Sequence, residues 1–487
     1  MKFARAAMTL LVAAGLYGQS VQTEAHRTAC AQLLREVDLL RIAIGAPAIL
    51  LATVDLQEAT GIEWRFAAGV GGTHGGLPID GAAAIVRAGS VSMVVTALAV
   101  VGHTMALRLA GRYEANGRWF ELIPRGADLV FDPCIGSATV QHLVGEQLVS
   151  MDALGKTDRV LSVLPTGAVQ IGAVAFSRAP DNRPLPPPAL LAPLLGEYGW
   201  PHAQIVVYEV RGQLGLVLDG KVRELPKVNP DGSFTLSPGL RGSEVMRFVR
   251  DAKGLVTALE LDLVCWPKIV HPADGAFRIP LRQPLAAIRA AMAAATPPKA
   301  EALMRTPSLV DLRSLSPALL FDLRYATNDN FLGERVYDAA VPMLQREAAV
   351  ALQQAQQELR AQGFGLCVFD AYRPWSITKL FFEATPDNMR QFVADPATGS
   401  RHNRGCAVDL TLYDLNTSEL LSMPCGFDEF TTRAYPDWPG GNELQRWHRD
   451  LLRSAMERAG FAVYEYEWWH YDFGDWRQYP VQNQPLR

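Results

Sequence analysis

The stretch SRHNRGCAVDLTLY, residues 400–413, decides the fold of the last third of this chain. It places an imidazole and a carboxylate, His402 and Asp409, on either side of Gly405. Glycine allows the backbone to turn there, and the alternation that follows predicts a strand over residues 405–412. The stretch therefore predicts a turn that brings two metal-ligand residue types to one end of a strand.

A second stretch, EWWH at residues 467–470, lies in an aromatic-rich segment that is typical of a strand. A catalytic zinc site takes three protein ligands and leaves one position open. His402, Asp409 and His470 would supply these ligands, and Glu467 would be free to take a proton from the water on the metal. Glu467 and His470 have opposite parity on a strand, so they converge on one metal only if the strand ends or bulges between them.

A third stretch, DAYRP at residues 370–374, follows an apolar run that predicts a buried strand over residues 365–370. Arg373 is a fixed cation there that could stabilise the oxyanion of a tetrahedral intermediate. Helical spacing predicts helices over residues 343–362 and 444–459. Helices and strands alternate without a strict βαβ rhythm, which favours an α+β domain.

Each stretch also has a plainer interpretation when taken singly. A histidine and an aspartate seven positions apart occur often by chance, an aromatic EWWH segment is commonly a core strand, and one arginine is commonly a surface ion pair. The three together resemble a known family. Residues 307–479 are similar to the D-alanyl-D-alanine dipeptidases of the VanX type, zinc peptidases related in fold to bacterial D,D-carboxypeptidases and to the hedgehog signalling domain.

This resemblance rests on the patterns S-x-H-x-x-G-x-A-x-D, D-x-Y-R-P and E-W-W-H, all complete in the three stretches. It implies one Zn²⁺ per chain on His402, Asp409 and His470. It also implies that Glu467 is the general base and that Arg373 acts at the transition state.

The resemblance further implies that Ser400 and Asp428 hold the free amine of the substrate, with Tyr325 near the site. The expected function is zinc-dependent hydrolysis of small D-Ala-D-Ala-type dipeptides by a Glu-activated water on the metal. Two alternatives stay open: a D,D-carboxypeptidase acting on cell-wall peptides, and a non-catalytic wall-binding or sensing protein in which zinc is structural. An intact base and a fixed cation argue against the non-catalytic alternative, because a closed structural site uses neither.

The front of the chain resembles a different family. Residues 87–100 are similar to the nucleophile helix of the beta-lactamase-related serine hydrolases, with Ser90 in the serine position. Met93 stands where that family has a lysine, and a thioether cannot serve as a base. The resemblance predicts a degenerate, truncated α/β serine-hydrolase region over residues 26–183 that lacks acyl-transfer activity.

Three further segments complete the expected organisation. Short strands with turn signals between them predict a small antiparallel β-barrel over residues 190–280, similar to the accessory barrel of those hydrolases. Residues 281–306 are rich in Ala and Pro and predict a partly helical linker. Residues 307–487 form the expected zinc domain.

Bulk properties limit location and partners. The net charge is −4 without a basic tract, so no nucleic-acid partner is expected. Two early cations and a short apolar run predict a signal peptide over residues 1–25 and export to the periplasm, the alternative being a core helix in a cytoplasmic protein. No apolar run is long enough for a stable membrane span.

Six dispersed cysteines are free thiols, or form one or two disulfides if the protein is exported. The oligomeric state stays open.

Overall fold

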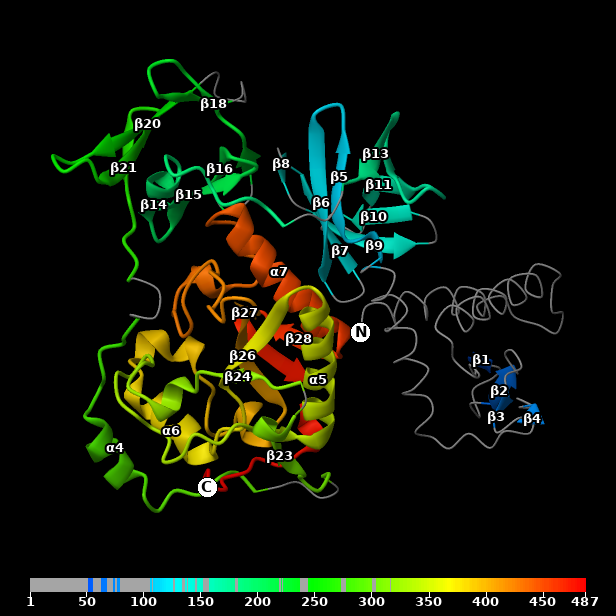
Figure 1. The fold of residues 1–487 in the computed structure, drawn as a ribbon, viewed down its shortest axis with the longest axis vertical. Helices are drawn as coiled ribbons and strands as arrows, with labels where there is room; N and C mark the ends of the chain where they lie inside the picture. Colours follow the sequence, from blue (N-terminus) through cyan, green and yellow to red (C-terminus); the bar gives the residue numbers. More distant parts are fainter. Residues whose placement is uncertain are drawn as a thin grey trace. The chain divides into compact units, whose positions relative to one another are not determined.

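The computed structural model describes two long parts of the chain and four short strands before them (Figure 1). The long parts are residues 106–179, with gaps at 107, 126–127, 134–135, 138, 145–146 and 152–156, and residues 183–487, with gaps at 219, 221, 237–243, 273–276, 300–303 and 316. The short strands are β1 (Leu51–Asp55), β2 (Glu63–Ala67), β3 (Thr73–His74) and β4 (Leu77–Pro78). The predicted signal peptide and the segment around Ser90 lie outside the described residues.

The chain divides into two compact units, residues 1–132 with 139–179, and residues 133–138 with 180–487. The first unit holds a closed eight-stranded barrel in the order β10-β11-β12-β13-β5-β6-β7-β9. Its strands are β5 (Gly111–Ala115), β6 (Arg118–Arg125), β7 (Asp128–Pro133), β9 (Thr139–Val144), β10 (Gln147–Met151), β11 (Thr157–Val163), β12 (Val169–Ile171) and β13 (Val174–Arg178).

This barrel corrects the α/β expectation for the front region, whose described part is almost entirely strand. Apolar side chains alternate along β6, where Phe120 and Leu122 are buried in the barrel core. Asn116 and Gly117 both have positive φ, 52° and 75°, between β5 and β6. An Asn-Gly pair in this conformation makes a two-residue hairpin turn. The serine-hydrolase remnant is not confirmed.

Residues 196–267 form two five-stranded antiparallel sheets around one core, with β8 (Gly136–Ser137) at the edge of the first. The antiparallel expectation is confirmed, but neither sheet closes into a barrel. The first sheet also has β14 (Gly196–Trp200), β15 (Ala203–Val210), β16 (Gln213–Leu218) and β17 (Val222–Glu224). The second has β18 (Lys227–Val228), β19 (Phe234–Thr235), β20 (Val245–Arg250), β21 (Val256–Leu261) and β22 (Val264–Pro267).

The last part of the chain is built on a mixed five-stranded sheet in the order β24-β26-β27-β29-β28. The β24–β26 pair is parallel and the others are antiparallel. The strands are β24 (Leu320–Phe321), β26 (Phe364–Asp370), β27 (Ala407–Asp414), β28 (Phe461–Tyr464) and β29 (Glu467–Phe473), and a small sheet pairs β23 (Leu309–Asp311) with β25 (Met343–Gln345).

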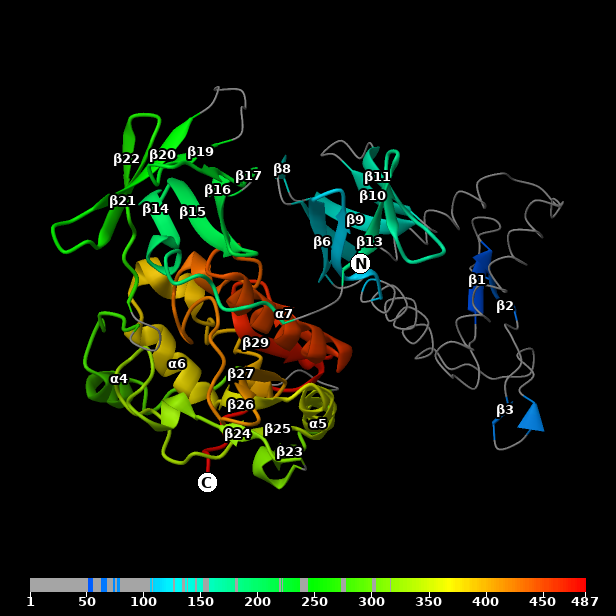
Figure 2. The same ribbon diagram turned by 45° about the horizontal axis from the view of Figure 1, so that its top comes forward.

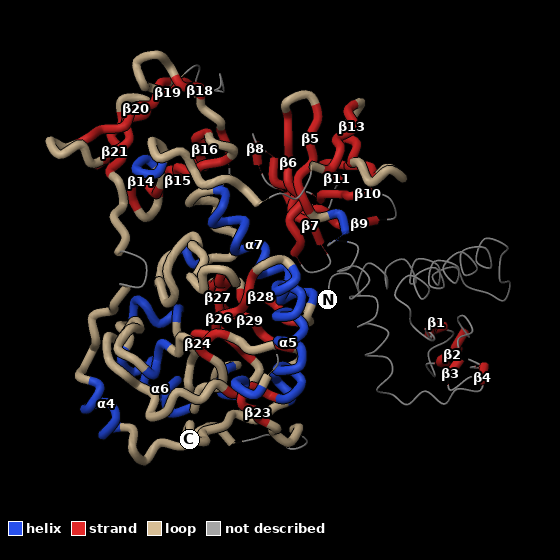
Figure 3. The backbone as a smooth tube through the Cα atoms, viewed as in Figure 1, coloured by secondary structure: helices blue, strands red, loops and turns tan. Residues whose placement is uncertain are grey.

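Helices pack on this sheet and on one another, which confirms the α+β expectation for the last domain. The helices are α4 (Leu285–Ala291), α5 (Arg346–Ala361), α6 (Trp375–Ala384) and α7 (Glu443–Arg458). Helix α5 packs on β26, and α7 packs on β27, β28 and β29 (Figure 3). Every residue of β26 is buried, as expected for a central strand covered on both faces. Among the described residues, none of the helices has the length and apolar character needed to cross a bilayer.

Strand register is what positions the site. Asp370 of β26 pairs with Asp409 of β27, and Asp409 pairs with His470 of β29. The ladder is irregular beside Asp370, and again where β28 and β29 meet near Tyr464 and Glu467. The aromatic segment predicted as one strand is therefore a hairpin, and Glu467 lies at the start of β29. This is the strand end that convergence of Glu467 and His470 requires.

Candidate metal centre and active site

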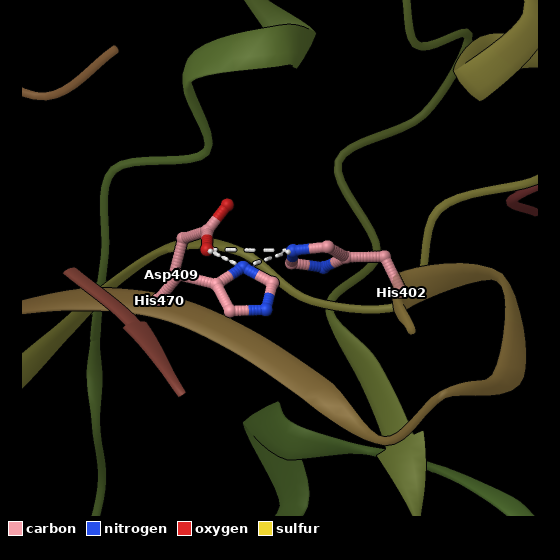
Figure 4. Close-up of side chains that lie close together, drawn as sticks. All are labelled: His402, Asp409 and His470. Atoms are coloured by element: carbon pink, nitrogen blue, oxygen red, sulfur yellow. Dashed lines mark hydrogen bonds and ion pairs between the residues drawn. The ribbon is translucent and has the colours of Figure 1, made fainter. Parts of the chain in front are cut away.

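Three buried side chains converge at one end of the central strands (Figure 4). His402 comes from a short 3-10 helix, His402–Arg404, and Asp409 and His470 are cross-strand partners. Their candidate ligand atoms all lie within 4.8 Å of one another. His402 Nε2 and His470 Nδ1 are 3.1 Å apart, and Asp409 Oδ1 lies 3.3 Å from the first and 3.0 Å from the second.

The outer nitrogens of both rings determine what the inner nitrogens can do. His402 Nδ1 is 2.6 Å from the carbonyl of Ala371, and His470 Nε2 is 3.0 Å from Asp472 Oδ1. A carbonyl and a carboxylate only accept, so both outer nitrogens donate. In neutral imidazoles the inner nitrogens then carry lone pairs, which face each other and the Asp409 carboxylate.

Such a cluster requires positive charge at its centre. Asp409 Oδ1 is buried and makes no hydrogen bond of normal geometry despite the short distances to both rings. Burial lowers the pKa of His470, but Asp472 and Asp409 outweigh this effect and raise it to about 10. A proton on His470 or a bound cation can meet the requirement, and only a cation satisfies all three donors at once.

The donor set fits zinc. Ligand bonds of about 2.0–2.1 Å in a tetrahedral site put neighbouring donor atoms about 3.3 Å apart, close to the spacing found here. Two histidines and one carboxylate leave a fourth position, the pattern of catalytic sites. Ala371 and Asp472 supply the outer hydrogen bonds that orient metal-binding histidines.

Glu467 lies beside this cluster but does not join it. Its Oε2 is 3.8 Å from His470 Nδ1, and its side chain is 17% exposed. Burial raises the pKa of Glu467 to about 7, and Asp409 reinforces this effect, while His470 and Arg373 oppose it. A carboxyl group with a pKa near neutrality is suited to proton transfer at physiological pH.

Arg373 is held as a fixed cation at the edge of the cluster. Its guanidinium lies 2.8 Å from Asp370 Oδ2 and 3.7 Å from Asp409 Oδ2, and its side chain is 10% exposed. Asp370 in turn accepts a 2.7 Å hydrogen bond from Tyr337 Oη. No sequence pattern assigned a role to Asp370 or Tyr337, although Asp370 is the first residue of the D-x-Y-R-P pattern.

Tyr325 and Asp428 form a hydrogen-bonded pair next to Arg373. Tyr325 Oη donates to Asp428 Oδ1 at 2.9 Å, and the guanidinium carbon of Arg373 is 5.2 Å from the Tyr325 ring centroid. Asp428 Oδ2 is buried and makes no hydrogen bond. Burial, with Asp409 and Glu467 adding to it, raises the pKa of Asp428 well above its usual range. This carboxyl is therefore short of a positive partner.

Ser400 is the predicted site residue that the described contacts do not bring to Asp428. Its Oγ accepts from the backbone N–H of Asn403 at 3.2 Å and lies 3.4 Å from Thr378 Oγ1. Asn403 also donates to the carbonyl of Arg373 at 2.7 Å. Ser400 and Asn403 thus brace the turn that carries His402.

Comparisons with known proteins agree with this arrangement. The family described as D-ala-D-ala dipeptidase, Peptidase_M15, matches residues 305–485. A D-alanyl-D-alanine dipeptidase of Escherichia coli (strain K12) is 36% identical over 176 residues, 36% of this chain and 90% of that protein. Proteins of the same name from Enterococcus faecalis (strain ATCC 700802 / V583) and Streptomyces coelicolor (strain ATCC BAA-471 / A3(2) / M145) are 37% identical over 173 residues and 35% identical over 175 residues. Each of these two matches covers 32% of this chain, and they cover 86% and 87% of the respective relatives.

The fold and the site together define a metallopeptidase. The chain belongs to the D-alanyl-D-alanine dipeptidase family, through its last 180 or so residues.

Proposed function

We propose that the chain hydrolyses small dipeptides that have a free amino terminus, with D-Ala-D-Ala as the expected type. The observation that carries this proposal is the buried Asp428 Oδ2, which has no hydrogen-bond partner and is linked through Tyr325 to the cation that flanks the metal cluster. A substrate ammonium group would satisfy that oxygen. Family membership and the names of the relatives support the substrate class.

Each side chain has a separate task in the proposed reaction. His402, Asp409 and His470 would hold one zinc ion, which when bound polarises a carbonyl and acidifies water. Glu467 takes a proton from the attacking water and passes it to the leaving amine. Arg373, locked on Asp370, stabilises the developing oxyanion. Asp428 and Tyr325 fix the ammonium group, so that the peptide carbonyl is directed toward Glu467 and Arg373.

A panel of dipeptides tests this function. Purified protein loaded with zinc is assayed on D,D-, L,D- and L,L-dipeptides and on their N-acylated forms. Hydrolysis confined to free D,D-dipeptides supports the proposal. Efficient cleavage of acylated wall peptides would favour a D,D-carboxypeptidase, and no hydrolysis of any substrate would favour a wall-binding or sensing protein.

We expect N-acetyl-D-Ala-D-Ala to be a much poorer substrate than D-Ala-D-Ala. Acetylation removes the positive charge and leaves a buried oxygen of Asp428 unpaired, a loss of roughly ten- to a hundredfold in kcat/KM. Kinetics on the two substrates measure this ratio. Asp428→Asn should bring the kcat/KM values of the two substrates closer together. Equal cleavage of both substrates by the unmodified protein would contradict the role of Asp428.

We also expect kcat/KM to fall as the pH drops below neutrality. Glu467 accepts a proton only as the carboxylate, so activity is present above its pKa and lost as the pH falls through it. Burial raises that pKa to about 7, and the positive charge of bound zinc favours the carboxylate, which shifts the acid limb below 7. A pH profile from about pH 5 to about pH 8 measures the limb. A flat profile would contradict the assignment.

A further inference from the structure

The loop from Asp428 to Asn442 joins the proposed amine site to helix α7. Within the second unit, β14 and β15 of the first antiparallel sheet meet this loop (Figure 2). The same loop therefore contacts the active site at one end and an appended sheet along its length. This makes the sheet a candidate for controlling how the loop presents Asp428.

Asp428 adopts a backbone conformation that its neighbours must maintain. Its φ is 60°, in the left-handed region, which a residue with a side chain rarely occupies without support. On the preceding side, Phe427 packs on Phe369 and Trp469, with ring centroids 4.7 Å and 5.4 Å away. These contacts anchor one flank of Asp428 to the peptidase core.

The following side is anchored by Glu429, whose side chain is 2% exposed. Glu429 Oε1 accepts from Thr431 Oγ1 at 2.7 Å and lies 3.5 Å from the guanidinium of Arg433. His271, which follows β22 along the chain, places its Nδ1 4.0 Å from the same oxygen. The second flank of Asp428 thus depends partly on a residue outside the peptidase fold.

Glu197 of β14 connects His271 to the rest of the loop. One carboxylate oxygen is 2.7 Å from His271 Nε2, and the other accepts from Trp438 Nε1 at 3.0 Å and from Thr432 Oγ1 at 3.4 Å. The side chain is 3% exposed. Burial works to raise its pKa, but the hydrogen bonds from His271 and Trp438 outweigh burial and lower it. A buried carboxylate with this many partners is a strong local constraint.

A second contact fixes the far end of the loop. Glu209 of β15 donates its backbone N–H to the carbonyl of Gly441 at 3.0 Å, and its side chain accepts from the N–H of Glu443 at 3.0 Å. Glu443 is the first residue of α7, so Glu209 satisfies one of the unpaired N–H groups at that helix start. The sheet therefore holds the loop at two separated points.

We propose that Glu197 is a positioning residue for the amine site: through His271, Thr432 and Trp438 it holds the 429–441 loop so that Asp428 can pair with the ammonium group of a free dipeptide. This inference rests on the proposed function of Asp428. It assigns the antiparallel sheets a role in substrate recognition without contact with substrate.

The Escherichia coli relative has no room for such sheets outside its matched part. The Escherichia coli protein is matched over 90% of its length by 176 residues. The unmatched tenth is too short to hold a counterpart of the sheets formed by residues 196–267. Glu197 also lies outside residues 305–485, the part of the chain that the family model matches.

The test compares Glu197→Ala with the unmodified chain, both loaded with zinc. We expect KM for D-Ala-D-Ala to rise about tenfold, the effect of one lost buried hydrogen bond, while kcat and the zinc content change little. The preference for D-Ala-D-Ala over its N-acetyl form should shrink in parallel. Glu197→Gln keeps an acceptor for Trp438 and should restore most of the affinity.

Tyr198→Phe is the matched control, because Tyr198 is the next residue of β14 and its Oη donates to the carbonyl of Leu194, away from the loop. It should lower thermal stability without raising KM. If Glu197→Ala does not fold, Trp438→Phe removes the N–H donor together with part of the indole ring and should raise KM in the same direction. An unchanged KM in the Glu197 or Trp438 variant, or an equal rise in Tyr198→Phe, overturns the inference. An unmodified chain with no preference for free amines rejects the role of Asp428 as well, so the two failures are distinguishable.

Discussion

Replacing Glu467 by glutamine is expected to leave zinc in place and to lower kcat by about a hundredfold or more. The amide has nearly the same shape as the carboxylate but cannot accept the proton of the attacking water. Glu467 is 3.8 Å from His470 and is not one of the three clustered donors, so its replacement should not remove a ligand. Zinc analysis and steady-state kinetics on D-Ala-D-Ala measure the two effects separately.

Glu465→Gln is the appropriate control for this experiment. Glu465 lies two residues earlier, in the turn between β28 and β29, and is exposed. Its replacement makes the same chemical change on the same hairpin and should leave turnover unchanged. Near-normal turnover in Glu467→Gln, or loss of zinc along with activity, would rule out Glu467 as a base that does not bind the metal.

Removing either histidine of the cluster is expected to abolish both zinc binding and activity. Two ligands are too few to hold zinc as a catalytic site does. His402→Ala leaves His470 held by Asp472, and His470→Ala leaves His402 held by Ala371, so a loss of zinc reports the missing ligand itself. Metal analysis after dialysis should show little or no zinc in each variant. The zinc-dependent increase in melting temperature should disappear as well.

His202→Ala controls for general effects of losing an imidazole. His202 is exposed in the turn between β14 and β15 and belongs to the same compact unit. This variant should keep its zinc and its melting temperature. Full zinc content in either cluster variant would contradict the ligand assignment.

The two sets of variants also separate the competing functions. A wall-binding protein with structural zinc would lose stability in His402→Ala and show no effect of Glu467→Gln on ligand binding. A peptidase also loses zinc in His402→Ala, but in addition it loses turnover in Glu467→Gln, because Glu467 acts only in proton transfer. Burial raises the pKa of Glu467 to about 7, which suits proton transfer in a peptidase. A wall-binding protein has no use for such a group.

The local sequence was sufficient to predict the elements that carry the site. Apolar residues at helical spacing predicted α5 and α7 to within a few residues, because an amphipathic helix needs only its own pattern and one surface to cover. The run that became β26 was equally clear, since a strand buried on both faces is continuously apolar. Motif patterns singled out His402, Asp409 and His470, which the structure places within 4.8 Å.

The front of the chain shows what a local resemblance leaves undetermined. The stretch similar to a nucleophile helix, residues 87–100, lies outside the described residues, whereas the described strands between residues 111 and 178 close into a barrel. Each barrel strand is short and half-buried, so its pattern is weak on its own. Closure depends on pairing between strands such as β13 and β5, which are far apart in the sequence.

Only the tertiary structure decided how the site residues act on one another. The register that aligns Asp370, Asp409 and His470 across three strands joins residues up to a hundred positions apart. The hydrogen bonds that turn both ring lone pairs inward come from Ala371 and Asp472, which no ligand motif singles out. Trp438 and Glu197 are 241 positions apart, and their contact exists only because β14 packs against the loop that precedes α7. The periodicity of apolar residues shows which face of a helix or strand is buried. Which element packs against that face is determined by the packing of the whole unit.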